Sequence, residues 1–262
     1  MLARINAIAL NTFREAARIR VLYGIIVLVL GANLFAIVLG EMSIREHARV
    51  ARDVGLAGIS LFGSLTAIFL GVFLLYGEVQ RRTIHAIVSK PIERWEFVVG
   101  KYVGMALLLS VLVALFGIAM MLMLVFEGAG VSSAVFKALA LAWCEVLTVA
   151  AIAIFFSSFS SPFLSAIFAA SMWLLGRITP DIEAAARSSS DVIQWTTKVA
   201  LEITPDLHLF SISGRTLEGA AVSVNGDFVS WAYVATAALH GLGWTVGLLA
   251  FAALLFHRRD FV

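Results

Sequence analysis

Long runs of apolar residues, separated by shorter polar segments, dominate the chain. A run of about 20 predominantly apolar residues is long enough to cross the hydrocarbon core of a membrane as a helix. The fifth run is short and ends at Arg177, so either the Arg177 side chain reaches back to the surface or the helix stops inside the bilayer. We predict an all-α integral membrane protein with one transmembrane domain over residues 1–262. Its six spanning helices are predicted at residues 21–40, 56–77, 98–126, 135–156, 163–176 and 228–256.

The first 20 residues precede these spans and have a different pattern. Between residues 2 and 19, apolar and polar positions alternate with the period of a helix. Apolar residues lie on one side (Leu2, Ile5, Ala9, Phe13, Ala16 and Ile19) and polar residues on the other (Arg4, Asn11, Arg14, Glu15 and Arg18). This pattern predicts an amphipathic helix in the membrane interface. A cleaved signal peptide would carry its apolar core here, so we expect the segment to be retained.

Two polar regions are predicted to form short helices on the outer side of the membrane. Residues 41–55 carry a nearly neutral mixture of charges. The longer region, 177–227, has a helical pattern at 184–203, which Pro205 ends, and a second short amphipathic piece at 207–212. Asp227 is placed to cap the last spanning helix.

The segment between the second and third spans, residues 78–97, is the longest charged excursion that returns directly to an apolar helix. Its surroundings hold the densest basic cluster of the chain (Arg81, Arg82, Lys90, Arg94 and Lys101). Pro91 has no N–H and restricts the residue before it to extended geometry, so the chain must turn at residues 89–91. Glu93 and Glu96 then fall at the start of the next helix, where negative charge meets the positive end of the helix dipole. The pattern predicts a helical hairpin at the membrane surface.

The distribution of charge predicts the orientation. Basic loops beside spanning helices stay on the cytoplasmic side. The segments on the side of the hairpin hold eleven cations and five anions, a net charge of +6. The segments on the other side hold eight cations and eleven anions, a net charge of −3, with Glu145 left inside the membrane. A topology with six spans and both termini in the cytoplasm places the positively charged segments on the cytoplasmic side.

Composition excludes several classes of function. The chain is 61% hydrophobic and has a mean hydropathy of +0.98, which leaves no room for a sizeable soluble domain. A formal charge of +2 does not indicate nucleic-acid binding, and a single cysteine, Cys144, can form neither an internal disulfide nor a zinc cluster. The five histidines form no ligand-like cluster, and no P-loop, G-x-S-x-G or H-E-x-x-H motif occurs. We therefore expect no ATP binding, catalysis or metal binding by this chain.

Glu145 is the acidic residue that falls inside a predicted span. Placing such a group in a membrane costs about 2.5 to 3.5 kcal/mol on insertion scales, so exposure to lipid is not expected. Three interpretations remain open: a hydrogen-bonded clamp between helices, a polar group on a translocation path, or a group at a dimer seam. Separately, Gly100 with Gly104 and Gly243 with Gly247 have the four-residue spacing that allows helices to approach closely.

The charged segment resembles the first cytoplasmic loop of the ABC-2 type exporter permeases, in particular the branch that includes the permease paired with the nitrous-oxide-reductase maturation ATPase. The six-span layout and the basic tail at 257–262 extend the resemblance over the whole chain. The matching positions are Glu78, Arg82, Thr83, Ser89, Lys90, Pro91, Ile92, Gly100 and Lys101.

The resemblance implies a permease subunit that works as a pair, bound to two copies of a separate ATP-binding subunit, in a bacterial plasma (inner) membrane. ATP and Mg²⁺ would bind that partner, and this subunit would need no cofactor. The hairpin would be the coupling element, and the N-terminal helix an elbow that also touches the ATPase. A further partner on the outer side, at 177–227, is left open. The coupling residues would be Glu78, Arg81, Arg82, Thr83, Ile84, Ser89, Lys90, Pro91 and Arg94.

Two other classes compete with this interpretation. A secondary transporter or channel without an ATPase would be expected to show several intramembrane ionisable groups or inverted repeats. An intramembrane enzyme would need a catalytic constellation, and the sequence shows none. Purification together with an ATPase subunit distinguishes the permease from both.

Overall fold

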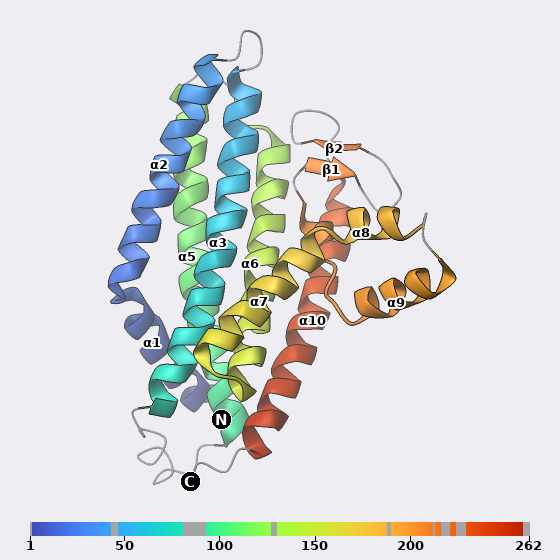
Figure 1. Ribbon diagram of the computed structural model, residues 1–262. Coiled ribbons are helices and arrows are strands. Elements are labelled where there is room, and N and C mark those ends of the chain that lie inside the picture. The colour runs from blue at the N-terminus through green and yellow to red at the C-terminus, as the bar shows by residue number, and fades with distance from the viewer. Residues whose placement is uncertain are drawn as a thin grey trace.

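Side-by-side long helices form the body of the protein, with smaller elements along one flank (Figure 1). The computed structural model describes residues 2–42, 47–80, 93–126, 130–187, 190–211, 213–215, 221–223 and 229–258. Helix α1 begins and α10 ends at the same end of the bundle, the end at which α3 ends and α5 begins. The elements named here are α1 (Leu2–Ala17), α3 (His47–Gln80), α5 (Arg94–Phe126) and α10 (Trp231–Arg258).

Four helical segments are long and apolar enough to cross a membrane. They are Arg52–Leu74 within α3, the whole of α5, α6 (Ser133–Phe159), and Trp231–Leu255 within α10. Two bent pairs also pass the test: α1 with α2 (Arg20–Met42), bent by 66°, and α7 (Pro162–Arg177) with α8 (Thr179–Ala186), bent by 65°. The described residues therefore contain four candidate spans, or up to six if each bent pair is one span. This confirms a multi-pass membrane protein, while the exact six-span layout stays a prediction.

The short outer helix predicted at 41–55 is wrong. Helix α2 continues to Met42, and the residues from His47 onward belong to the long helix α3. Residues 47–55 contain no proline, and the first glycine, Gly55, lies against Asn33 and Met120, so nothing ends the helix there. Charged residues thus extend a spanning helix instead of forming a separate element.

The flank region is divided differently from the prediction of one helix at 184–203. Helix α8 ends at Ala186, and α9 (Asp191–Glu202) begins after Ser190, whose extended backbone (ψ 155°) is that of an N-cap. The predicted piece at 207–212 is a 3₁₀ turn, η1 (Leu207–Phe210). Strands β1 (Ser213–Arg215) and β2 (Ala221–Ser223) add an antiparallel ribbon that the sequence pattern did not indicate.

Helix α6 is the centre of the bundle and packs against α3, α5, α7, α10 and η1. Its residues 149–154 are all buried, and six consecutive residues point in every direction around a helix. The α6 backbone is approached closely at several glycines of its neighbours. A Cβ at Gly63 of α3 would lie 2.7 Å from Val146 Cγ2, and one at Gly71 would lie 2.5 Å from Ala153 Cβ. These glycines let α3 and α6 pack nearly backbone to backbone.

The two glycine pairs singled out in the sequence differ in what lies opposite them. A Cβ at Gly104 would lie 2.3 Å from the carbonyl oxygen of Ala9, and one at Gly100 would lie 2.7 Å from Ile8 Cγ2, so α1 packs directly on α5. Gly243 and Gly247 of α10 have nothing within 4 Å among the described residues. The close approach predicted for Gly100 and Gly104 is confirmed, and its partner is the N-terminal helix.

Candidate functional site

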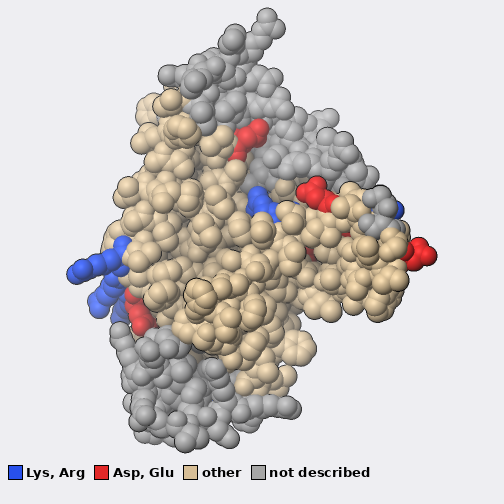
Figure 2. Space-filling model, viewed as in Figure 1, with Lys and Arg blue, Asp and Glu red and all other residues tan. Residues whose placement is uncertain are grey.

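Charged side chains form small separate patches on a mostly uncharged surface, and Figure 2 shows among them a basic patch near the middle of the view and an acidic patch near the top. Basic side chains cluster over α1 and the start of α2, where Arg4, Arg14, Arg18 and Arg20 are exposed. Acidic side chains lie mainly over α8 and α9, where Asp181, Asp191 and Glu202 are exposed.

Most of the predicted coupling hairpin lies outside the described residues. Seven of its nine proposed contact residues fall in 81–92 (Arg81, Arg82, Thr83, Ile84, Ser89, Lys90 and Pro91). The other two flank that gap: Glu78 belongs to the last turn of α3, and Arg94 is the exposed first residue of α5. The ends of the hairpin are thus the ends of two long helices.

The start of α5 is fixed by its own sequence. Glu96 lies in the first turn, and its Oε2 accepts the backbone N–H of Glu93 at 3.4 Å, as in a capping box. The Glu93 carboxylate accepts the indole N–H of Trp95. This confirms the prediction that negative charge gathers at this helix start, where it also complements the helix dipole.

Helix α1 packs against the first turns of α5. In addition to the contacts at Gly100 and Gly104, two ion pairs of opposite polarity connect the helices: Arg4 Nη1 to Glu96 Oε2 at 3.8 Å, and Lys101 Nζ to Glu15 Oε2 at 3.4 Å. Each pair joins a buried side chain to a partly exposed one and adds to the close packing at Gly100 and Gly104. The Lys101 side chain is 3% exposed and also lies over the Phe97 ring.

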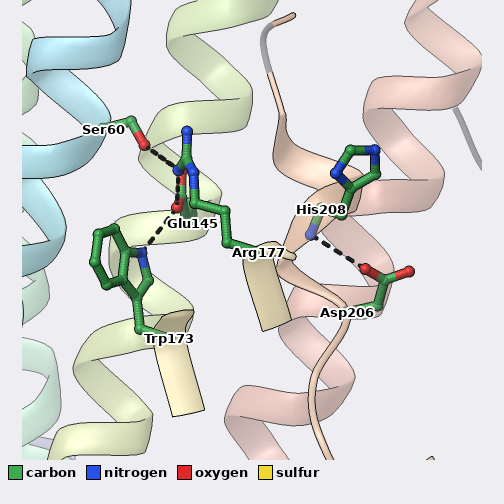
Figure 3. Close-up of polar contacts among 6 residues, drawn as sticks. All are labelled: Ser60, Glu145, Trp173, Arg177, Asp206 and His208. Atoms are coloured by element: carbon green, nitrogen blue, oxygen red, sulfur yellow. Dashed lines mark hydrogen bonds and ion pairs between the residues drawn. The ribbon is translucent and has the colours of Figure 1, made fainter. Parts of the chain in front are cut away.

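Glu145 lies at the centre of a polar cluster between α3, α6 and α7 (Figure 3). Ser60 Oγ donates to Glu145 Oε2 at 2.6 Å, and Trp173 Nε1 donates to Oε1 at 3.1 Å. Arg177 Nη1 donates to the same Oε1 at 2.5 Å and to Ser60 Oγ at 2.7 Å. Glu145 is fully buried within one subunit, which confirms that lipid does not reach it. Each carboxylate oxygen has a donor from a neighbouring helix.

The fold explains why these residues meet. Ser60 precedes Gly63 by about one helical turn, so the close packing of α3 on α6 brings its hydroxyl to the carboxylate. Trp173 and Arg177 are four residues apart and therefore on one face of α7. A buried pair of opposite charges holds together only when further hydrogen bonds satisfy it, and Ser60 and Trp173 provide them. The arrangement acts as a clamp across three helices.

Arg177 was the residue that the sequence pattern placed least well. The Arg177 side chain, which is 28% exposed, turns inward to Glu145, whereas the sequence pattern assigned Arg177 to the outer segments. Without Arg177 the outer segments hold seven cations and eleven anions, a net charge of −4, so the charge split becomes larger. One feature of the sequence could have indicated this pairing. Placing Glu145 inside the membrane is costly, so a cationic partner at a similar depth was to be expected. Ser60 and Trp173 carried no such signal.

No group of histidine, cysteine or acidic residues that could hold a metal ion occurs in the described part of the chain. The comparisons with known proteins then decide the family. The family model for ABC-2 family transporter proteins matches residues 6–261. This chain belongs to that family. A search of curated proteins found no match.

Membership in the ABC-2 transporter family places the chain among the membrane components of ABC transporters. Such a component works with an ATP-binding subunit, which is the part that hydrolyses ATP. The matched range runs from within α1 to past the end of α10 and includes the flank region.

Proposed function

We propose that this protein is the permease subunit of an ATP-driven ABC-2 exporter. Two permease copies form the translocation path, and the first cytoplasmic loop, residues 78–97, couples each copy to one of two ATP-binding subunits. ATP and Mg²⁺ bind those partners. The residues of the loop support membership of the branch that includes the nitrous-oxide-reductase maturation permease.

The position of the loop between two long helices carries this proposal. Residues 81–92 join Gln80, the last residue of α3, to Glu93, which caps α5. Helices α3 and α5 both pack on the central helix α6. A displacement of the loop by an ATPase would therefore move the ends of two helices that both pack on α6. The contacts between α1 and α5 would keep the first turns of α5 attached to α1.

The first experiment changes the proposed contact. Arg82→Glu with Thr83→Trp introduces reversed charge and bulk, and such juxtapositions cost several kcal/mol at an interface while leaving the free subunit intact. We expect normal membrane insertion and loss of the co-purifying ATPase. The chain offers a matched control, because Arg215 and Thr216 form the same dipeptide in the region assigned to the outer side. Arg215→Glu with Thr216→Trp should leave the ATPase bound, and equal binding by both double mutants would exclude this loop as the coupling element.

The second experiment tests the orientation and the six-span layout. Reporter fusions at Arg82 and Val262 should report the cytoplasm, and a fusion at Ser189 should report the opposite side. The charge split of +6 against −3 supports this expectation. The six-span layout places three spans between Arg82 and Ser189, so a cytoplasmic signal at Ser189 would require an even number there and would exclude this layout.

A role for Glu145 on the translocation path is a separate part of the proposal. Glu145→Gln keeps an acceptor for Arg177 and Trp173, so the fold should be retained. If Glu145 lines the path, transport and transport-coupled ATP hydrolysis should both fall. Normal values of both would leave the interhelical clamp as its role. Transport that persists without any ATPase would instead favour the secondary transporter or channel.

A further inference from the structure

Helix α9 turns its apolar side away from the protein. Val192, Trp195 and Val199 share one helical face, and the Val192 and Trp195 side chains are 74% and 67% exposed. No residue of α9 is buried. On α7, the helix before α8, Leu174 and Leu175 are also exposed. A face of this kind is stable against hydrocarbon and unfavourable against water, at about 25 cal/mol for each Å² exposed.

Helix α7 is short for a spanning helix, and α8 and α9 follow it directly. Helix α7 has 16 residues and is therefore about 24 Å long, less than the roughly 30 Å of a hydrocarbon core. The chain then bends by 65° into α8 and leaves the spanning direction. Tryptophan favours the membrane–water boundary, and Trp195 lies on the apolar face of α9. In the proposed topology, which puts α8 and α9 at the outer surface, the inner side of α9 lies near lipid head groups.

That inner side lines a pocket of about 400 Å³ between α8, α9 and η1. This volume is in the range of small-ligand sites. The pocket contains three carboxylates, two cations and two threonine hydroxyls, contributed by Glu183, Glu202, Asp206, Arg187, Lys198, Thr179 and Thr197. Among the described residues, these five charged side chains form no ion pair with one another. Groups of both signs thus line one space, and in this part of the described chain they form no ion pairs with one another.

Asp206 likewise has no lysine or arginine paired with it among the described residues. Burial raises the pKa of its carboxyl above the ordinary value, and the Glu183 carboxylate adds to the rise. The backbone N–H of His208, 3.1 Å from Asp206 Oδ1, and the imidazoles of His208 and His240 lower the pKa only in part. An ammonium group placed between Glu183 and Asp206 would relieve both the burial and the repulsion.

We infer that the pocket between α8, α9 and η1 binds the head group of a phospholipid that carries a primary ammonium. The phosphate is held by Arg187 and Lys198, the ammonium by Glu183, Glu202 and Asp206, and the acyl chains continue along the apolar face of α9. This inference rests on the proposed topology, in which α8 and α9 lie at the outer surface.

The test measures lipid binding by native mass spectrometry on the purified full-length subunit in detergent, without an ATPase. Phosphatidylethanolamine should bind more tightly than phosphatidylcholine or phosphatidylglycerol. Glu202→Gln with Asp206→Asn should weaken phosphatidylethanolamine binding about tenfold, the usual effect of losing a charge-assisted contact, and leave phosphatidylglycerol unchanged. Arg187→Gln with Lys198→Gln should weaken both lipids.

Asp181→Asn is the matched control for the carboxylate variants. Asp181 lies on α8, is exposed and does not line the pocket, so its loss removes one negative charge without touching the site. Thermal melting in detergent establishes that each variant is folded. The inference is overturned if the pocket variants bind phosphatidylethanolamine as Asp181→Asn does, or if phosphatidylcholine binds equally well. It is also overturned if the variants alter only the oligomeric state, because the α9 face would then contact a second copy.

A soluble ligand with the same chemistry is distinguished by a second titration. Phosphoethanolamine should raise the melting temperature much less than short-chain phosphatidylethanolamine at equal concentration, because it lacks the chains that cover α9. Equal stabilisation would assign the pocket to a soluble zwitterion and overturn the lipid assignment. Because no ATPase is present, loss of lipid binding with intact ATPase coupling counts against this inference alone. Intact lipid binding without an associated ATPase counts against the proposed function alone.

Discussion

Glu145 and Asp206 are two carboxylates removed from water in different ways, and Figure 3 shows both. Glu145 accepts hydrogen bonds from side chains of α3 and α7, one of them cationic. Asp206 accepts the backbone N–H of His208, two residues further along its own segment, and no lysine or arginine of the described chain pairs with it. A carboxylate with partners on other helices joins those helices. A half-buried carboxylate with only a local partner remains available to a ligand.

Removing Arg177, the cationic partner of Glu145, should have the largest effect on stability. Arg177→Met leaves Glu145 buried without a counter-charge, and breaking a buried pair on one side costs about 3 to 5 kcal/mol. We expect a large fall in the melting temperature of the subunit in detergent. Adding Glu145→Gln should recover part of the loss, because no uncompensated charge then remains. Arg187→Met, the same change at an exposed position, should have little effect, and equal melting temperatures for the two methionine variants would show that the Glu145 pair does not clamp the helices.

The close packing of α3 on α6, the helix that carries Glu145, should give the next largest effect on stability. A side chain at Gly71 would meet Ala153 of α6, so Gly71→Leu must separate α3 from α6, and overpacking of this kind costs about 1 to 3 kcal/mol. The open surface of α10 supplies the comparison. Gly243 has nothing within 4 Å in the described chain, so Gly243→Leu should change stability by no more than about 0.5 kcal/mol. Equal losses in thermal melting would mean that α10 is packed as closely as the α3–α6 seam.

The sequence predicted much of the bundle, because spanning helices are indicated by local composition. It also predicted that Glu145 would be protected, since any exposed charge in hydrocarbon is costly. It could not predict the partner, because the pairing of Arg177 with Glu145 depends on which face of α7 meets α6. Spacing likewise showed that Gly100 and Gly243 allow close approach, but only the topology brings α1 to one and leaves the other open.

The flank region was the least predictable part for a related reason. Asp206 has an unremarkable sequence context, and its burial arises because Leu207 and Phe210 of η1 pack against α6 and α7. The polar pocket beside it exists only because α8 and α9 fold back on each other after the serines at 188–190. Local patterns indicated helices here without indicating which residues would face each other.

A single hydrogen bond to Glu145 should matter less than the ion pair or the seam. Ser60→Ala removes the donor to Oε2 and one acceptor for Arg177, and a net loss of about 1 kcal/mol is typical. Ser64 is a matched control, because it is buried on the same helix and its hydroxyl has no partner among the described residues. Ser64→Ala should therefore be neutral or slightly stabilising. If thermal melting shows the same change for both variants, the hydroxyl of Ser60 does not support the cluster.

The smallest effect on stability is expected at Asp206, where the substitution to asparagine should raise the melting temperature at neutral pH instead of lowering it. Because the pKa of Asp206 is raised in the folded protein, its ionisation costs more there than in the unfolded chain. In the absence of ligand, the native protein should therefore lose stability as pH rises from the ordinary aspartate pKa through the raised one, whereas Asp206→Asn, which keeps an acceptor for the His208 N–H, should not. The melting temperatures of the two proteins should agree at about pH 4 and diverge slightly in favour of the asparagine variant by pH 7. Saturating phosphatidylethanolamine should reverse this order at pH 7, because the ammonium stabilises only the ionised carboxylate. A native protein that is the more stable of the two at pH 7 without lipid would show that Asp206 is already compensated, as Glu145 is.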